Sequence, residues 1–69
     1  MDELEAVAAC HVQAGDELPG PGRIYVLGAW GVREYAPDGR TMQVTEIQFS
    51  DGTTTRLPPF AAVMRYRRP

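Results

Sequence analysis

The middle of the chain has the alternating hydrophobic and polar pattern that is typical of β-strands. One long segment, residues 23–35, carries apolar side chains on both phases, and two shorter segments, 41–49 and 53–57, follow it. The turns between them are Pro37-Asp38-Gly39 and Ser50-Asp51-Gly52, in which glycine supplies the positive φ of a tight hairpin. We therefore expect 23–35 to pair with 41–49, and 44–49 to pair with 53–57, in a three-stranded meander.

Glycines mark two places where the strand geometry must change. Pro19-Gly20-Pro21-Gly22 predicts a rigid loop ahead of the long strand, because each proline fixes its own φ and restricts the residue before it. Gly28 and Gly31 flank Trp30, and we expect a bulge or a sharp bend there, as a strand that serves two sheets requires.

The first twelve residues fit two templates. A helix that begins at Asp2 would place Leu4, Val7, Ala8 and Val12 on one stripe, whereas a strand would alternate Leu4, Ala6, Ala8, Cys10 and Val12. Neither template is excluded. We favour a short helical or irregular lead-in that passes into a first strand near 9–12, because Ala14-Gly15-Asp16 supplies a turn directly afterwards.

The last part of the chain predicts a break and then a final strand. Pro58-Pro59 removes two backbone donors and ends the third strand of the meander. Phe60-Ala61-Ala62 is long enough for a single 3₁₀ turn, and residues 63–66 return to a β pattern. We assign Phe49 and Phe60 to the core.

This layout resembles the SH3-like barrel, the broad group that includes Tudor and KOW modules. The residues that carry the resemblance are Ala14-Gly15-Asp16, Phe49-Ser50-Asp51-Gly52 and Leu57-Pro58-Pro59-Phe60. It implies a mostly β fold, a five-stranded small barrel with a lead-in and a 3₁₀ turn before the last strand. Residues 44–61 also resemble short uncharacterised proteins of high-GC bacteria and their phages. Neither resemblance implies an activity.

The length of 69 residues predicts one domain, 1–69, with one small core. A single cysteine forms no internal disulfide, so we expect self-association or partner binding to add stability. No stretch approaches a membrane span, and the acidic start lacks the basic region of a signal peptide. We therefore expect a cytoplasmic protein without membrane contact, in which Cys10 is a buried, unreactive thiol.

Charge is distributed unevenly along the chain, although the net charge is only -2. The acidic residues Asp2, Glu3, Glu5, Asp16 and Glu17 lie near the start, and Arg56, Arg65, Arg67 and Arg68 lie near the end. The two ends are expected to attract each other or partners of opposite sign.

The inventory of reactive side chains predicts no catalysis. The chain contains one serine, Ser50, one cysteine, Cys10, and one histidine, His11. Cys10 and His11 are neighbours in the sequence, so in a strand their side chains would point to opposite faces. Asp38, Asp51 and the pair Asp16-Glu17 are better explained as turn and solvent-facing residues. No recognised metal spacing or phosphate loop is present, and we expect no cofactor.

Aromatic and arginine residues provide the binding candidates. Six aromatic residues are too many for so small an interior, and exposed aromatics often carry binding energy. The candidates are Tyr25, Trp30, Arg33, Tyr35, Arg56, Arg65, Tyr66 and Arg67.

Two hypotheses follow. The first is a non-catalytic protein-interaction module, a bacterial or phage accessory protein, that docks another protein near Trp30 and self-associates. The second is binding of a nucleotide or nucleic acid through the arginines of the C-terminal strand, with Tyr66 stacking on bases. The sequence pI of 5.2 argues against the second, and edge protection is the alternative role of these arginines.

Overall fold

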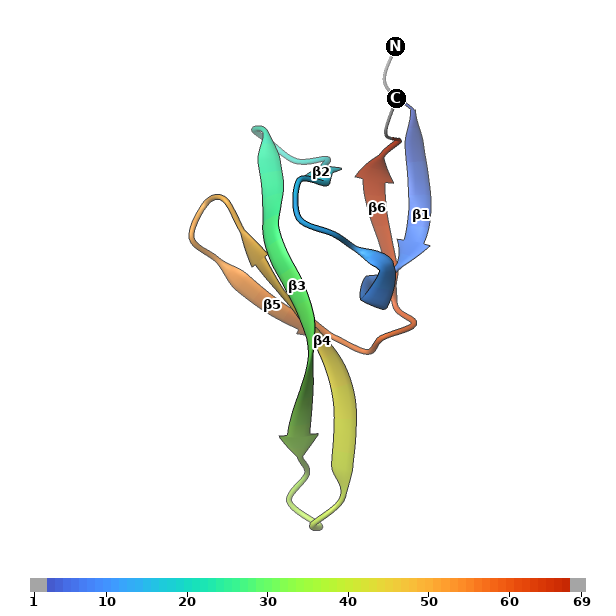
Figure 1. Cartoon of the computed structure of the whole chain (residues 1–69), viewed down its shortest axis with the longest axis vertical. Helices are drawn as coiled ribbons and strands as arrows, with labels where there is room; N and C mark the ends of the chain where they lie inside the picture. Colours follow the sequence, from blue (N-terminus) through green and yellow to red (C-terminus); the bar gives the residue numbers. More distant parts are fainter. Residues whose placement is uncertain (1–2, 68–69) are drawn as a thin grey trace.

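The two aspartate-glycine turns fold the middle of the chain into the predicted meander. Figure 1 shows a computed structural model of the chain, in which residues 3–67 are described. β3 (Ile24–Tyr35) pairs antiparallel with β4 (Thr41–Phe49), and β4 pairs with β5 (Thr54–Leu57). Gly39 and Gly52 have φ values of 86° and 90°, which side chains with a Cβ rarely adopt. The glycines of both turns are therefore required by the backbone.

A β-bulge lies beside Gly28, as the sequence predicts. The register between β3 and β4 shifts between Val26 and Gly28, and pairing is regular from there to the turn. Gly31 stays in register opposite Thr45, so the irregularity lies on one side of Trp30 only.

The predicted order of elements at the start of the chain is wrong. Residues 4–8 form a strand, β1 (Leu4–Ala8), and the expected first strand near 9–12 is a 3₁₀ turn, η1 (Ala9–His11). The backbone explains the difference, because the Cys10 N–H donates to the Pro59 carbonyl and the Val12 N–H to that of Ala9. Asp2, the predicted helix cap, lies outside the described residues.

The final strand forms as predicted, but the turn before it is not a 3₁₀ helix. β6 (Ala62–Tyr66) pairs antiparallel with β1, with Ala6 opposite Met64. Before it, the Ala61 N–H donates to the Pro58 carbonyl over 3.0 Å, which closes one turn. Ala62 already belongs to β6, so the turn cannot extend into the predicted 3₁₀ segment 60–62.

The strands form two sheets and no closed barrel. β1 and β6 make a two-stranded sheet, and β2 (Glu17–Leu18) joins the meander in the order β2-β3-β4-β5. Residues 3–67 are mostly β, as predicted, but they contain six strands in place of five. No ladder joins the sheets within residues 3–67. The proline-glycine loop partly explains why no ladder joins the two sheets, since it limits β2 to two residues.

The core lies between the two sheets. Val12, Val26 and Ile47 form its centre, and six half-buried side chains pack around them: Val7, Leu18, Ala29, Phe49, Leu57 and Val63. Phe49 thus lies at the core as predicted. Phe60 does not, because the turn after Pro58 carries it outward and leaves it 86% exposed.

The distal part of the β3–β4 hairpin stands away from this core. β5 pairs with β4 only from Thr45 to Gln48, and β2 pairs with β3 only at Ile24 and Tyr25. Residues 32–44, here called the hairpin arm, therefore form a two-stranded ribbon, visible at the bottom of Figure 1. The molecule measures 47 × 22 × 18 Å as a result. In the part of the chain that the structure describes, no helix is long and apolar enough to span a membrane.

Candidate functional site

The register of the meander places Trp30 on the face that points away from the core. Ala29 and its partner Ile47 face inward, so Trp30 and its partner Glu46 face outward. We call this side of the four-stranded sheet the outer face. Further along the arm the same side also carries two opposed pairs, Glu34 with Met42 and Val32 with Val44, of which Val44 is buried.

Gly28 allows the indole ring of Trp30 to lie along the strand. A Cβ atom at Gly28 would lie 2.9 Å from Cζ3 of Trp30. Trp30 as a residue remains 44% exposed. Tyr25 and Leu27 precede the bulge and are also exposed, and Tyr25 lies on the side opposite buried Val26. An accessible apolar surface therefore runs along β3.

A charged network crosses the same face. The Arg56 side chain donates from Nε to Glu46 at 2.8 Å and from Nη1 to Glu34 at 3.3 Å. The hydrogen bond to Glu46, and then that to Glu34, raises the pKa of Arg56 above its ordinary value. Arg56 is thus held by two carboxylates beside the Trp30 surface.

Tyr35 and Arg33 do not share a face with Trp30. No register shift separates these residues along β3, so the odd-numbered Arg33 and Tyr35 point to the opposite side of the arm. Tyr35 is 75% exposed there. The structure therefore brings Trp30 and Tyr25 onto one face and leaves Tyr35 apart from them.

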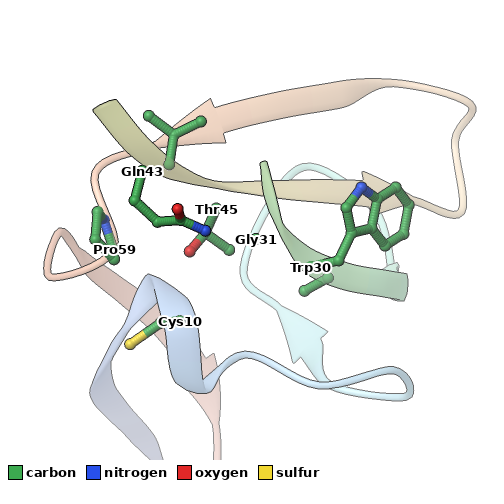
Figure 2. Close-up of a pocket in the computed structure, with 8 residues that line it drawn as sticks. Cys10, Trp30, Gly31, Gln43, Thr45 and Pro59 are labelled. Carbon is green, nitrogen blue, oxygen red and sulfur yellow. The ribbon is translucent and has the colours of Figure 1, made fainter. Parts of the chain in front are cut away.

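A cleft of about 140 Å³ opens on the inward side of the same strands. It is lined by Cys10, Ala29, Trp30, Gly31, Gln43, Val44, Thr45 and Pro59. Figure 2 shows the Gln43 amide over Gly31, whereas the Trp30 ring points away from the cleft. Cys10 is exposed here, which contradicts its predicted burial. The 3₁₀ turn directs Ala9 into the core in place of Cys10.

The arginines near the end of the chain bind carboxylates near its start. Arg65 donates to Asp16 at 2.9 Å and to Glu5 at 3.0 Å, while Arg67 contacts Glu3 at 3.2 Å and Glu5 at 3.6 Å. Of the two expectations for the uneven charge, attraction between the ends is therefore realised. Tyr66 between them is half-buried, and Arg68 lies outside the described residues.

Asp16, like Cys10 and Phe60, does not lie where the sequence pattern predicts. It was expected to face solvent, but it is only 1% exposed, and its carboxylate accepts hydrogen bonds from Arg65 and from the Gln13 backbone. Hydrogen bonding to Asp16 raises the pKa of Arg65. The sequence pattern around Asp16 does not indicate that its side chain is buried. The uneven charge along the chain was the one usable indication.

Asp38 and Asp51 are turn residues, as the sequence predicts. Asp38 accepts a hydrogen bond from the Arg40 N–H, and Asp51 accepts one from the Thr53 N–H. The Ser50 hydroxyl accepts a hydrogen bond from the Tyr25 N–H across the sheet. Within residues 3–67, no three His, Cys, Asp or Glu side chains are grouped in a way that could hold a metal ion.

Comparisons with protein-family models, with curated proteins and with solved structures found no match to this chain. The site is therefore interpreted from its own geometry.

Proposed function

We propose that the chain is a non-catalytic protein-interaction module that docks a partner protein on the outer face around Trp30. The observation that carries the proposal is a half-exposed Trp30 on a strand paired with β4, beside other accessible apolar side chains. Tryptophan is prominent among the residues that dominate binding energy at protein interfaces. A partner that covers this ring would bury it without a change in the backbone.

The surroundings of Trp30 also suit a protein partner. Arg56, Glu46 and Glu34 form a paired network, so the rim of the surface offers hydrogen bonds and no concentrated charge. Interfaces commonly combine an apolar centre with a polar rim of this kind. In addition, the long outer edge of β3 beyond Val26 has no paired strand among the described residues, and a partner strand has room to align there.

The arginines support the nucleic-acid alternative less well. Arg56, Arg65 and Arg67 each pair with two carboxylates, so a phosphate would have to displace them. The alternative predicts an affinity for single-stranded nucleic acid that falls steeply as salt rises. Fluorescence anisotropy of a labelled oligonucleotide tests it, and on our proposal no binding is detected even at low salt.

The proposal extends to the fold and to the setting of the protein. We regard the pairing of the first strand with the last, around a central meander, as an open arrangement related to the SH3-like barrel. The supporting feature is the strand order of the two sheets. We further propose that the protein is an accessory protein of a bacterium or phage and acts in the cytoplasm.

Affinity capture with three forms of the chain tests the docking surface. Wild type, Trp30→Ala and Tyr35→Ala are compared, because Tyr35 is an exposed aromatic of the same strand on the other face. The proteins captured by wild type should also be captured by the Tyr35 variant and be lost with the Trp30 variant. Equal capture by all three folded forms would contradict the proposal.

A further inference from the structure

The two-stranded sheet of β1 and β6 has an unusual distribution of side chains. Val7 and Val63 face the core, and Glu5 and Arg65 point to the same side, where Arg65 reaches buried Asp16. The alternate positions point outward, and they are all apolar: Leu4, Ala6, Ala8, Ala62, Met64 and Tyr66. The outward side of this sheet is here called the β1–β6 face.

This arrangement reverses the usual one for a sheet with one side in water. Such sheets normally point apolar residues inward and polar residues outward. Here the charged pair lies inside and no charged residue lies on the β1–β6 face, where Leu4 and Met64 are 45% and 44% exposed. A register slip of one residue would reverse the two sides, but the ion pair of Arg65 with Asp16 holds the observed register.

The chain as a whole exposes more surface than a compact monomer of its mass. The chain exposes 4922 Å², about 600 Å² more than the roughly 4300 Å² expected of a compact monomer of 7.6 kDa. Specific dimers bury about 600 to 1000 Å² on each partner. The excess is similar in size to one side of a small dimer interface, and the hairpin arm that stands away from the core contributes to it.

The composition of the β1–β6 face suits a second copy of the same chain. In a two-fold symmetric dimer the same face of each copy forms the interface, so charged residues on that face would meet residues of like charge. The β1–β6 face bears no charge, and the small side chains of Ala6, Ala8 and Ala62 allow the second copy to approach closely. Phe60, in the turn that leads into β6, is a further large apolar side chain that is exposed.

We propose that two copies of the chain form a two-fold symmetric dimer by packing their β1–β6 faces together as the layers of a sandwich. The two-stranded sheet, marginal alone, then has a layer on each side. The charged pairs of Arg67 with Glu3 and Glu5 lie at the rim. This surface is separate from the outer face around Trp30, so a dimer retains two Trp30 sites.

Light scattering coupled to size-exclusion chromatography tests the dimer with a matched pair of variants. Met64→Arg places a charge in the β1–β6 face, and Met42→Arg places the same charge at an exposed methionine on the arm. Wild type and Met42→Arg should have twice the mass of 7.6 kDa. Met64→Arg should raise the dissociation constant at least about tenfold, because two guanidinium groups meet in an apolar contact. Ala6→Arg provides a second variant on the same face.

The outcomes separate this dimer from the proposed docking function. A wild-type monomer at every concentration, or a dimer that Met42→Arg disrupts and Met64→Arg does not, would overturn the dimer. Concentration-dependent growth beyond two copies would also overturn it, because a closed two-fold interface stops at the dimer. Captured partners that depend on Trp30 but not on Met64 would leave the docking function intact whatever the mass.

Discussion

Arg65 Nη1 donates a hydrogen bond to Asp16 Oδ2 over 2.9 Å, and this contact ties together two sheets that share no ladder within residues 3–67. Asp16 directly precedes β2, and its carbonyl accepts a hydrogen bond from the Val26 N–H. Arg65 belongs to β6 on the other sheet. The contact therefore links the two sheets through side chains.

Replacing the buried carboxylate should destabilise the protein strongly. We predict that Asp16→Ala lowers the free energy of unfolding by about 3 kcal/mol, because Arg65 loses its main partner and the Gln13 N–H its acceptor. Glu46→Gln, which removes one carboxylate from exposed Arg56, is the control and should cost much less. Urea unfolding measures both. A loss no larger for Asp16→Ala than for Glu46→Gln would contradict the role of this contact.

The turn at Asp51 should make stability depend on pH. Hydrogen bonds from the side chain and backbone of Thr53 lower the pKa of Asp51 below its ordinary value of 3.8. A lowered folded-state pKa means that the stabilisation is fully present above 3.8 and is lost as pH falls through the lower folded-state value. The melting temperature of Asp51→Asn should therefore fall less between neutral and strongly acidic pH than that of wild type. Parallel curves for the two proteins would refute this assignment.

The glycines of the hairpin turns should be more sensitive than a glycine in the loop before β3. Gly39→Ala and Gly52→Ala should each cost about 1 kcal/mol, because both positions have positive φ and open space where a Cβ would stand. Gly22→Ala is the control, with equally open space and no positive φ. Denaturation midpoints should fall for the first two only, and a fall of the same size in the Gly22 variant would show that the backbone argument is wrong.

The orientation of Trp30 should depend on Gly28. A Cβ at position 28 would lie 2.9 Å from the ring, so Gly28→Ala should move the indole outward. Because the chain contains one tryptophan, its fluorescence reports this directly: emission should shift to longer wavelength and acrylamide quenching should increase. Gly31→Ala is the comparison, since its nearest neighbour is the amide of Gln43. Identical spectra for wild type and Gly28→Ala would disprove the packing of the ring.

The meander was predictable because its signals are local. Pro37-Asp38-Gly39 and Ser50-Asp51-Gly52 define their turns by backbone requirements, and the alternating pattern between them then sets the pairing. The bulge beside Gly28 was also predictable, since glycine next to a large aromatic residue permits the change of register.

The start of the chain and the path of Phe60 were not predictable in the same way. Leu4, Ala6 and Ala8 alternate as a strand does, but only the partner residues of β6, 54 to 62 positions further on, decide between strand and helix. Phe60 appeared to be a core residue by its type, and the direction of the proline turn placed it outside.

The candidate site was only half predictable. Trp30 and Tyr25 were identified by residue type, but their separation from Tyr35 depends on the register beyond the bulge. Asp16 was missed because burial of a carboxylate depends on an arginine 49 residues away.

Solvent access to the single tryptophan side chain is the most direct test of the account. The chain is isotope-labelled at its indole nitrogen, and relaxation of that signal by a soluble paramagnetic agent is measured before and after addition of a partner captured by wild type. The account predicts strong relaxation of the free protein, in keeping with the 44% exposure of Trp30, and a marked decrease in the complex. Unchanged relaxation in a complex that has formed would contradict it.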